Sequence, residues 1–579
     1  MTNFTHFDDK LVFSLNTGPK SLMLKARDYT PQATENIAIT AFLLRWTLRA
    51  RGLMLHCAMA LLAIALIACG HHATVTTGQK DADRVLRRGL PGEPQTLDPQ
   101  VADDDFSFQV LRDLYEGLTS EDGSGQIVPG TADSWTLDSS GTIYNFHLRS
   151  EAKWSNGDRV TASEFVHGLR RAVDPKTASG SAGLLAVIKG ATDIIAGKKS
   201  ATELGVIAVD ESSVQIFLEH PAPFILQVLT QPIAAPLHDN KNAVPQKNAG
   251  PFNGAYILVN RVTGSYIDLA RNSEYWNSSK VPIKKVRYVN AESEATELRE
   301  YIAGDLDLTF SIPLPDLDRI SQKLRGEIQL SPTLGTTYLA LNLSRPPLKD
   351  DPALREALSI AVDREQIAKS VMAGVAPAYS FVANGTTGYA PPKYDWVNWS
   401  RDRQLAYARS LYSQAGYSAN KPLHLRLYFS NGESIQRLMI AVAGSWQQNL
   451  GVTSELINDE FRVFLAGRKD RSRWDAARLK WDADYDDPSS FLDVFASDSN
   501  QNDPDYKSLP FNSLIAQARS EADPGKRMAL LHSAEQVLMT DYPIIPIYFT
   551  RARRLVKPYV GGAKLSPMNR TYTKNLFWQ

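Results

Sequence analysis

The densest group of side chains that could do chemistry is an acidic cluster crowded by aromatic rings. Residues 480–488 read KWDADYDDP. Four carboxylates fall within six positions of this run: Asp482, Asp484, Asp486 and Asp487. Carboxylates this close repel one another unless a cation lies between them. The pattern therefore indicates a place where a positive group is held.

Three interpretations of this cluster stay open from the residues alone. A calcium loop would take oxygens from positions 482, 484 and 486, yet the glycine and the terminal glutamate of an EF-hand loop are missing. A solvated acidic loop without a ligand is the plain alternative. In the third interpretation, a carboxylate beside the rings of Trp481 and Tyr485 receives a ligand ammonium through charge-assisted hydrogen bonds and cation–π attraction.

The usual signatures of other chemistry are missing from the chain. There is no His-Glu-x-x-His and no Gly-x-Ser-x-Gly, and the glycines nearest to a phosphate loop, from Gly190 on, have six residues between them instead of four. Both cysteines, Cys57 and Cys69, precede residue 70, so no thiol nucleophile follows it. The ten histidines are scattered along the chain. We therefore expect no enzyme, no metal site and no cofactor.

The elements that would position the acidic cluster alternate between strands and helices. Period-two alternation predicts half-buried strands over Thr142–Arg149, Ser212–Glu219 and Leu423–Ser430. A period near 3.6 predicts helices over Pro352–Gly374, Glu433–Leu450 and Gly525–Asp541. The loop-rich stretch Ala234–Phe252 is typical of a crossing between domains. Such alternation favours α/β lobes over a sandwich or a bundle.

The N-terminal region has the pattern of an export signal. Three arginines between positions 45 and 51 precede the apolar run Leu53–Ala68, which is shorter than the roughly 20 residues of a membrane-spanning helix. The run ends in Leu66-Ile67-Ala68-Cys69, which resembles the lipobox of bacterial lipoproteins. Cys69 would then be the lipidated N-terminus; otherwise it is one more small residue of the signal. The stretch before Arg45 is long for an n-region, so we expect translation to start downstream of Met1 and assign it no fold.

Composition limits the class of protein. The 579 residues carry 63 Lys plus Arg against 63 Asp plus Glu, and 43% of them are apolar. With zero net charge and no basic stripe to neutralise phosphates, nucleic acid is not an expected partner. The length and composition are typical of a soluble globular protein of about three or four domains.

Several sequence blocks stand in a distinctive order along the chain: Pro94–Pro99, Asp113–Leu118, Tyr144–Arg149 with Ala152–Asp158, Asn253–Tyr256, Arg355–Arg364 and Arg554–Pro558. Together with the acidic cluster, these blocks resemble the oligopeptide-binding proteins of bacterial peptide ABC importers, within the extracellular solute-binding proteins of family 5. That family also includes dipeptide, murein-peptide and nickel binders. The resemblance covers nearly the whole chain after the export signal.

The resemblance implies an α/β, periplasmic-binding-protein-like fold with two lobes (Venus flytrap) and three domains. Residues 1–69 would be the signal peptide with its lipobox, and 70–83 a tether. Domain I would be discontinuous, with domain II inserted within it and domain III forming the opposite lobe. The implied bounds are 84–120, 235–334 and 545–579 for domain I, 121–234 for domain II and 335–544 for domain III. The ligand would be enclosed at the hinge between the lobes.

The resemblance also implies roles for single residues. The family's ammonium-binding aspartate follows a tryptophan by three positions, which matches Asp484 and Trp481. Arg478 and, across a one-residue gap, Arg468 match basic positions and are candidates for a peptide carboxylate; a solvated surface role fits Arg468 equally. The candidate ligand-binding set is completed by Tyr485, Lys480, Asp482, Asn431, Ser311 and Asp103.

Two departures from the family pattern concern the far end of the ligand. Met372 and Ile435 stand where other members have a lysine and a histidine that help to hold the C-terminal carboxylate. The resemblance therefore implies that this chain captures the ligand's C-terminus differently, and that ligand length differs with it.

The expected function is that of a transport receptor, which captures oligopeptides in a largely sequence-independent way and delivers them to an inner-membrane ABC permease. It would be a periplasmic or cell-envelope monomer, anchored to the membrane by the lipid on Cys69. The alternatives are a binder of another family ligand (dipeptide, murein peptide, haem or nickel), an exported enzyme, or a lipoprotein chaperone. No nucleophile or acid–base pair supports the enzyme, and no histidine group near residues 478–490 supports nickel.

Replacing Cys69 tests the lipobox. Cys69→Ser removes the only sulfur that can carry the thioether, so we expect loss of fatty-acid incorporation and release of the protein from membranes. Metabolic labelling with a radioactive fatty acid, followed by fractionation, measures both, with Cys57→Ser as the matched control. A Cys69→Ser protein that is labelled and sediments like the wild type would contradict the lipoprotein hypothesis.

Overall fold

The computed structural model describes residues 4–7, 10–15, 22–25, 84–238, 250–313 and 317–579. The chain divides into two compact units, Met1–Lys80 and Asp81–Gln579. In the first unit, β1 (Phe4–Phe7), β2 (Lys10–Leu15) and β3 (Leu22–Lys25) form an antiparallel sheet in that order. The predicted signal run and Cys69 lie outside the described residues. Within the described ranges, no helix combines the length and the apolar character that crossing a bilayer requires.

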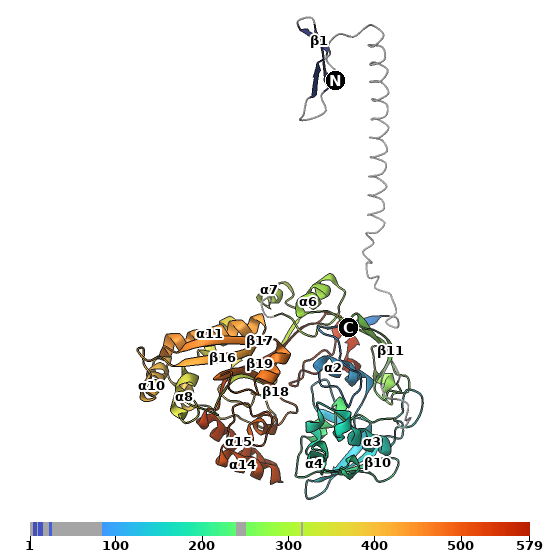
Figure 1. The fold of residues 1–579 in the computed structure, drawn as a ribbon. Helices are drawn as coiled ribbons and strands as arrows, with labels where there is room; N and C mark the ends of the chain where they lie inside the picture. The colour runs from blue at the N-terminus through green and yellow to red at the C-terminus, as the bar shows by residue number, and fades with distance from the viewer. Residues whose placement is uncertain (1–3, 8–9, 16–21, 26–83, 239–249, 314–316) are drawn as a thin grey trace. The chain divides into compact units, whose positions relative to one another are not determined.

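The second unit contains two hydrophobic cores, which define two lobes. The core of the first lobe draws mainly on residues 86–288, with additions from the C-terminal segment up to Leu576. The core of the second lobe draws on residues 298–555. Figure 1 shows the corresponding bodies, one in blue and green and the other in yellow, orange and red. The predicted domain bounds remain a prediction.

The first lobe contains two four-stranded sheets. One has the order β7 (Ala132–Leu137), β8 (Ile143–Leu148), β10 (Ser213–Phe217), β9 (Val206–Ala208). The other has the order β11 (Tyr256–Val262), β12 (Tyr266–Arg271), β13 (Lys285–Asn290), β4 (Val85–Leu90), in which only β13 and β4 are parallel. Two-stranded pairs are formed by β5 (Thr119–Glu121) with β6 (Ile127–Pro129) and by β20 (Val560–Gly561) with β21 (Phe577–Trp578). The helices are α2 (Asp105–Leu114), α3 (Ala162–Val173), α4 (Ala191–Ile195) and α5 (Ile225–Val228).

The second lobe is built on a six-stranded mixed sheet. Its order is β15 (Ala376–Pro377), β19 (Ile544–Leu555), β14 (Ile328–Leu341), β18 (Ala476–Asp482), β16 (His424–Ser430), β17 (Thr453–Asp459). The longer helices are α8 (Pro352–Ala361), α10 (Arg401–Gln414), α11 (Glu433–Leu450), α14 (Leu509–Ser520) and α15 (Pro524–Asp541). Shorter ones are α9 (Arg364–Gln366), α12 (Phe461–Gly467) and α13 (Ser489–Leu492). Two further helices, α6 (Glu294–Ala303) and α7 (Leu317–Lys323), precede β14 in the chain.

The predicted strands are confirmed as β8, β10 and β16, within two residues at each end. In β8, Tyr144, Phe146 and Leu148 are buried while the intervening side chains are exposed, which is the period-two pattern of a half-buried strand. The predicted helices at 433–450 and 525–541 are confirmed as α11 and α15. Helix α11 ends where Gly451 adopts φ 79°, a left-handed conformation that glycine reaches without a Cβ clash.

The prediction of one helix over Pro352–Gly374 is wrong. Helix α8 stops at Ala361 because Val362 is extended, and Asp363 then caps α9 by accepting a hydrogen bond from the N–H of Gln366. The cause is Arg364, whose buried guanidinium donates to the carbonyl oxygens of Ser359 and Pro546. Hydrogen bonds that the buried arginine donates produce this break, so the apolar period of the sequence does not predict it.

A buried ion pair joins the acidic cluster to α15. Asp487 accepts hydrogen bonds from both terminal nitrogens of Arg527, at 2.7 and 2.8 Å, and each side chain is only 5% exposed. Ser489 also donates its N–H and hydroxyl to the Asp487 carboxylate. These hydrogen bonds to the Asp487 carboxylate hold the segment after β18 against the second lobe.

Removing one partner of that pair should be costly. Arg527→Met leaves the Asp487 carboxylate buried without its cation, so we expect a loss of about 3–5 kcal/mol of unfolding free energy in urea titrations. The double variant Arg527→Met/Asp487→Leu should recover most of it, because no charge is then left buried. Arg437→Met, at an exposed pair with Glu433 3.9 Å apart, is the control and should change stability by less than about 0.5 kcal/mol. An Arg527→Met protein as stable as this control would show that the pair is not structural.

Candidate ligand-binding site

A cavity of about 1130 Å³ lies between the two lobes and has walls from both. The first lobe contributes residues along the length of α2, the segment 179–187 and the stretch 219–233. The second lobe contributes residues 480–485, the end of β19 and side chains around α13 and α14. Six of the ten predicted ligand-binding residues line it: Asp103, Lys480, Trp481, Asp482, Asp484 and Tyr485.

Three of the four clustered carboxylates have partners within the protein. Asp482 lies 2.5 Å from the ammonium of Lys480, and Asp487 is paired with Arg527. Asp486 accepts hydrogen bonds from the N–H and hydroxyl of Thr387, at 2.8 and 2.7 Å. No group of three or more acidic, histidine or cysteine side chains in the described residues could hold a metal ion. These engaged carboxylates disfavour the calcium-loop interpretation.

Tyr485 anchors the cluster in the opposite lobe. Its ring stacks on Phe224 with centroids 4.0 Å apart and planes within 6°, and it belongs to the core of the first lobe although its neighbours belong to the second. Gln227 makes a reciprocal pair of hydrogen bonds with the backbone of Asp486, accepting its N–H at 2.5 Å. The segment is therefore a buried junction between lobes, which disfavours a solvated loop.

The carboxylate of Asp484 is different, because no hydrogen bond from the described residues reaches it. Its backbone is held on both sides: its N–H donates to the hydroxyl of Ser490 at 2.8 Å, and its carbonyl oxygen accepts from Arg570 at 3.2 Å. The side chain is accessible from the cavity, yet the surrounding protein displaces enough water to raise the pKa of Asp484 to about 6. The Arg570 guanidinium lowers this pKa and Asp482 raises it, and both effects are smaller than that of burial.

The rings beside Asp484 have fixed orientations. Trp481 donates its indole N–H to the carbonyl oxygen of Ser490 at 2.7 Å, so its polar edge is satisfied and its face is left for contact. Arg570, behind Asp484, pairs with the buried Glu121 of β5. Asp484 thus has a carboxylate without a hydrogen-bond partner among the described residues, in a cavity that Trp481 also lines, which suits a cation with several N–H donors.

Four predicted residues do not line the cavity. Arg468 pairs with the fully buried Asp503 at 3.2 Å and donates to Gln501, which does line it. Arg478 lies on β18 with its Nε buried and without a hydrogen-bond partner.

The two remaining residues make hydrogen bonds elsewhere. Asn431 donates its N–H to the carbonyl oxygen of Asp459, and the hydroxyl of Ser311 donates to Glu294 at 2.8 Å. A ligand-binding role for these four residues stays a prediction.

The structure adds cavity residues that the sequence did not indicate. Phe224 and Arg570 lie about 260 and 90 positions from the acidic cluster, and Arg551 lies on β19. No local motif surrounds them, since they reach the cavity through the packing of separate elements. Arg570 is held in place by its buried pairing with Glu121, 449 positions away in the chain, and by its hydrogen bond to the carbonyl oxygen of Asp484.

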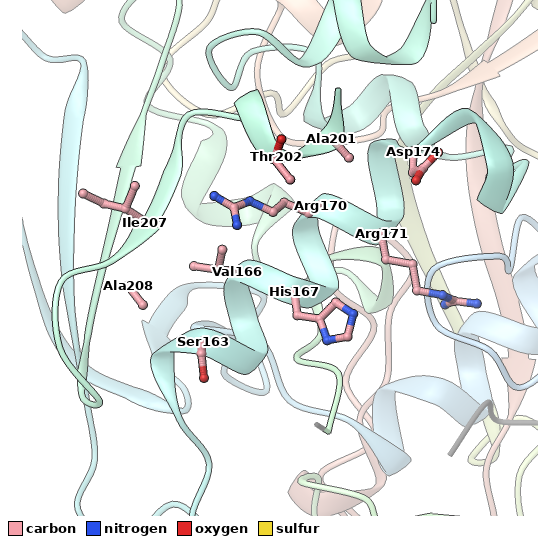
Figure 2. Close-up of a pocket in the computed structure, with 10 residues that line it drawn as sticks. All are labelled: Ser163, Val166, His167, Arg170, Arg171, Asp174, Ala201, Thr202, Ile207 and Ala208. Atoms are coloured by element: carbon pink, nitrogen blue, oxygen red, sulfur yellow. The ribbon is translucent and has the colours of Figure 1, made fainter. Parts of the chain in front are cut away.

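A second cavity of about 740 Å³ lies on the first lobe alone, along α3 (Figure 2). Its two arginines are engaged: Arg170 donates to the carbonyl oxygen of Val206 at 3.3 Å, and Arg171 pairs with Asp98 at 2.6 Å. Figure 2 shows the Arg171 side chain directed away from the other lining residues. None of the predicted site residues lies there, so the inter-lobe cavity is the candidate site.

Comparison with known proteins identifies the family. The chain matches the model of the bacterial extracellular solute-binding proteins, family 5 (middle region), over residues 126–503. It is 38% identical over 518 residues to the periplasmic oligopeptide-binding protein OppA of Salmonella typhimurium, covering 87% of this chain and 94% of that protein. The chain therefore belongs to family 5 of the bacterial extracellular solute-binding proteins.

Solved structures support the same fold. OppA of Burkholderia pseudomallei has a TM-score of 0.75 and 35% identity, over 86% of this chain and 100% of that one. OppA of Haemophilus influenzae in complex with the peptide RPPGFSPFR has a TM-score of 0.73 and 32% identity, over 86% and 99%. The predicted two-lobed, periplasmic-binding-protein-like α/β fold is confirmed, and these relatives are periplasmic binding proteins of peptide transport.

The raised pKa of Asp484 has a consequence for stability. A carboxylate whose pKa is higher in the folded than in the unfolded protein destabilises the fold fully above pH 6, and the effect disappears as the pH falls below the unfolded value near 3.8. Asp484→Asn should therefore raise the melting temperature at pH 7.5 by about 1–2 °C, a small gain because solvent reaches the group. At pH 4.5 the gain should be smaller.

The matched control for this measurement is Asp482→Asn, two positions away. It removes a partner of Lys480 and should give no gain at either pH. Thermal melts of the three proteins at both pH values, without added ligand, measure the difference. An Asp484→Asn variant that melts below the wild type at pH 7.5 would contradict the inference that the charged Asp484 carboxylate destabilises the fold.

Proposed function

We propose that this protein is the peptide receptor of an ABC importer, which encloses short oligopeptides in the inter-lobe cavity and delivers them to the membrane permease. The observation that carries the proposal is the carboxylate of Asp484, unpartnered among aromatic faces in that cavity. The relatives named as oligopeptide-binding proteins, one of them in complex with a nonapeptide, support the same ligand class.

The α-ammonium of a free peptide is the cation that fits Asp484. It brings three N–H donors and a positive charge, so binding replaces the solvation that burial removes from the carboxylate. Its approach beside Trp481 adds cation–π attraction. The peptide backbone would supply the remaining hydrogen bonds, which are common to all sequences and make recognition broad.

We propose further that the protein binds its ligand without catalysis. Several of the charged groups in the cavity are engaged in ion pairs, such as Lys480 with Asp482 and Arg519 with Asp493 at 2.9 Å. A general acid or base needs a titratable group free to exchange protons with a reacting atom. Asp484 has no hydrogen-bond partner among the described residues, and we propose that it holds a cation.

The location proposed for the protein is the periplasm or cell envelope, as a monomer tethered to a membrane by lipid on Cys69. The lipobox supports the anchor, and the periplasmic relatives support export. A single tethered receptor suffices for delivery, because each chain contributes both walls of its own cavity.

N-acetylation of the ligand tests the proposal. An N-acetylated peptide has no ammonium and leaves Asp484 unpaired, which costs about 2–5 kcal/mol, or roughly 30- to several-thousand-fold in affinity. Calorimetry with tetraalanine and its N-acetyl form should show this preference in the wild type. Asp484→Asn should lose most of it, while Asp482→Asn should keep it.

The alternatives predict other outcomes of the same experiment. If the wild type binds both peptides with equal affinity, Asp484 is not the ammonium site. Absence of binding to tetraalanine together with binding to an unfolded protein, such as reduced carboxymethylated lactalbumin, would favour the chaperone over the receptor. Binding of a short free peptide at micromolar or higher affinity supports the receptor.

A further inference from the structure

The second cavity, along α3 of the first lobe, is bordered by the free edge of a sheet. Strand β9 is the last strand of the order β7, β8, β10, β9, and Ile207 and Ala208 of β9 line the cavity together with side chains of α3. Ile207 is 42% exposed, and Val209, directly after β9, is 60% exposed. Exposed apolar side chains at an unpaired strand edge mark a place where another chain can bind.

The main chain of Ala208 faces this open edge. The N–H of Val209 donates to the carbonyl oxygen of Ser213 at 2.8 Å, so these two residues form a hydrogen-bonded pair of the antiparallel ladder between β9 and β10. Such pairs alternate with non-hydrogen-bonded pairs, and Ala208 opposite Val214 is one of the latter. The N–H and the carbonyl oxygen of Ala208 therefore point away from β10, and no hydrogen bond from the described residues reaches them. An added strand can pair with both groups.

Arg170 of α3 lies beside the same edge and has donors left to use. Its guanidinium donates one long hydrogen bond, of 3.3 Å, to the carbonyl oxygen of Val206, two positions before Ala208 on β9. Its Nε is buried without a hydrogen-bond partner, and Arg170 forms no ion pair with the described residues. Figure 2 shows its side chain extended across the cavity toward Ile207. A guanidinium has five N–H groups, so Arg170 can still bind a carboxylate.

The acidic groups nearest to Arg170 in the chain have other partners. Asp98 pairs with Arg171 at 2.6 Å. Asp174 caps the short helix that follows α3 by accepting the N–H of Lys176 at 3.0 Å. The positive charge of Arg170 is therefore left without a counterion among the described residues. A groove with this charge favours an acidic occupant.

We propose that the groove between α3 and β9 binds an extended acidic segment of another protein, which adds a strand to β9 and places a carboxylate on Arg170. The main chain of the segment pairs with Ala208, and its carboxylate makes charge-assisted hydrogen bonds with the guanidinium. This inference goes beyond the proposed function and does not depend on it, since the groove and the inter-lobe cavity share no lining residue.

The alternation of β9 sets the residue pattern of the segment. Successive side chains of a strand point to opposite faces, so Val206 and Ala208 share one face while Ile207 and Val209 share the other. Val206 is buried in the core of the first lobe, on the face against which α3 packs. The residue that pairs with Ala208 therefore points its side chain to the face of Arg170. Its two neighbours point to the face of Ile207 and Val209, which suits an acidic residue between two apolar ones.

The expected affinity is modest. The edge offers the main-chain groups of one residue, and the charge pair is only partly buried. Such an interaction forms and breaks readily, which suits transient docking of a partner on the outside of the first lobe. A ligand enclosed between the lobes leaves this groove accessible.

A capped peptide tests the groove. Fluorescence anisotropy follows fluorescein-labelled Thr-Val-Glu-Val-Thr-amide on the full chain, with excess tetraalanine present to fill the inter-lobe cavity. We expect saturable binding and a preference of about five- to tenfold over the same peptide with Gln in place of Glu, as for a partly exposed charge pair. Arg170→Gln should bind both peptides alike. Arg159→Gln, at an exposed arginine of the same lobe outside the groove, is the matched control and should keep the preference.

A second variant tests strand addition. Ala208→Pro removes the N–H at the open edge and leaves the ladder to β10 intact, because proline is tolerated at a sheet edge. Binding of both peptides should then be lost, whereas unchanged binding would contradict strand addition. Absence of saturable binding by the wild type, or a Glu preference that survives in Arg170→Gln, overturns the proposal. A dimer in sedimentation that Arg170→Gln abolishes would identify the occupant as a second copy of this chain and overturn the proposed partner.

Discussion

The structure depends on one constraint, the placement in a cavity of a single carboxylate, that of Asp484, which has no hydrogen bond or ion pair with the described residues. Every neighbour of Asp484 in the acidic cluster is satisfied internally, and its own backbone is held from both sides. Only the carboxylate of its side chain has no hydrogen-bond partner among the described residues. Burial raises its pKa to about 6, because the surrounding protein disfavours the charged form. A cation that enters the cavity relieves this cost, so the same strain that weakens the free protein strengthens the complex.

The segment that carries Asp484 also couples the two lobes. Tyr485 packs into the core of the first lobe, whereas Asp487 is locked to Arg527 in the second. Asp486 meets Gln227 on one side and Thr387 on the other. Thr387 follows a loop whose Phe381 and Val382 N–H groups donate to the buried Glu535 of α15. The site is therefore positioned by long-range contacts that end at one short segment, and its geometry is set before a ligand arrives.

The cavity combines opposite charges at separate places on one sheet. Asp484 follows β18 and Arg551 lies on β19, with β14 between these two strands. Family members with a lysine and a histidine at positions 372 and 435 would place positive charge from other elements. Here Met372 is buried in the core, and Arg551 contacts the backbone two residues beyond it.

The sequence by itself determined the local features of this protein. Alternation identified β8, β10 and β16, and the apolar period and Gly451 identified α11, whereas only the family resemblance singled out Asp484, whose role stays a prediction. These features depend on neighbours within a few positions, where chain geometry fixes which side chains share a face. Tertiary structure alone decided that α8 stops at Ala361, that Asp482 and Asp486 are engaged while Asp484 is not, and that Arg551 and Arg570 reach the cavity. Those outcomes depend on burial and on partners tens to hundreds of residues away, and no periodicity or spacing in the chain encodes which charges will be left without one.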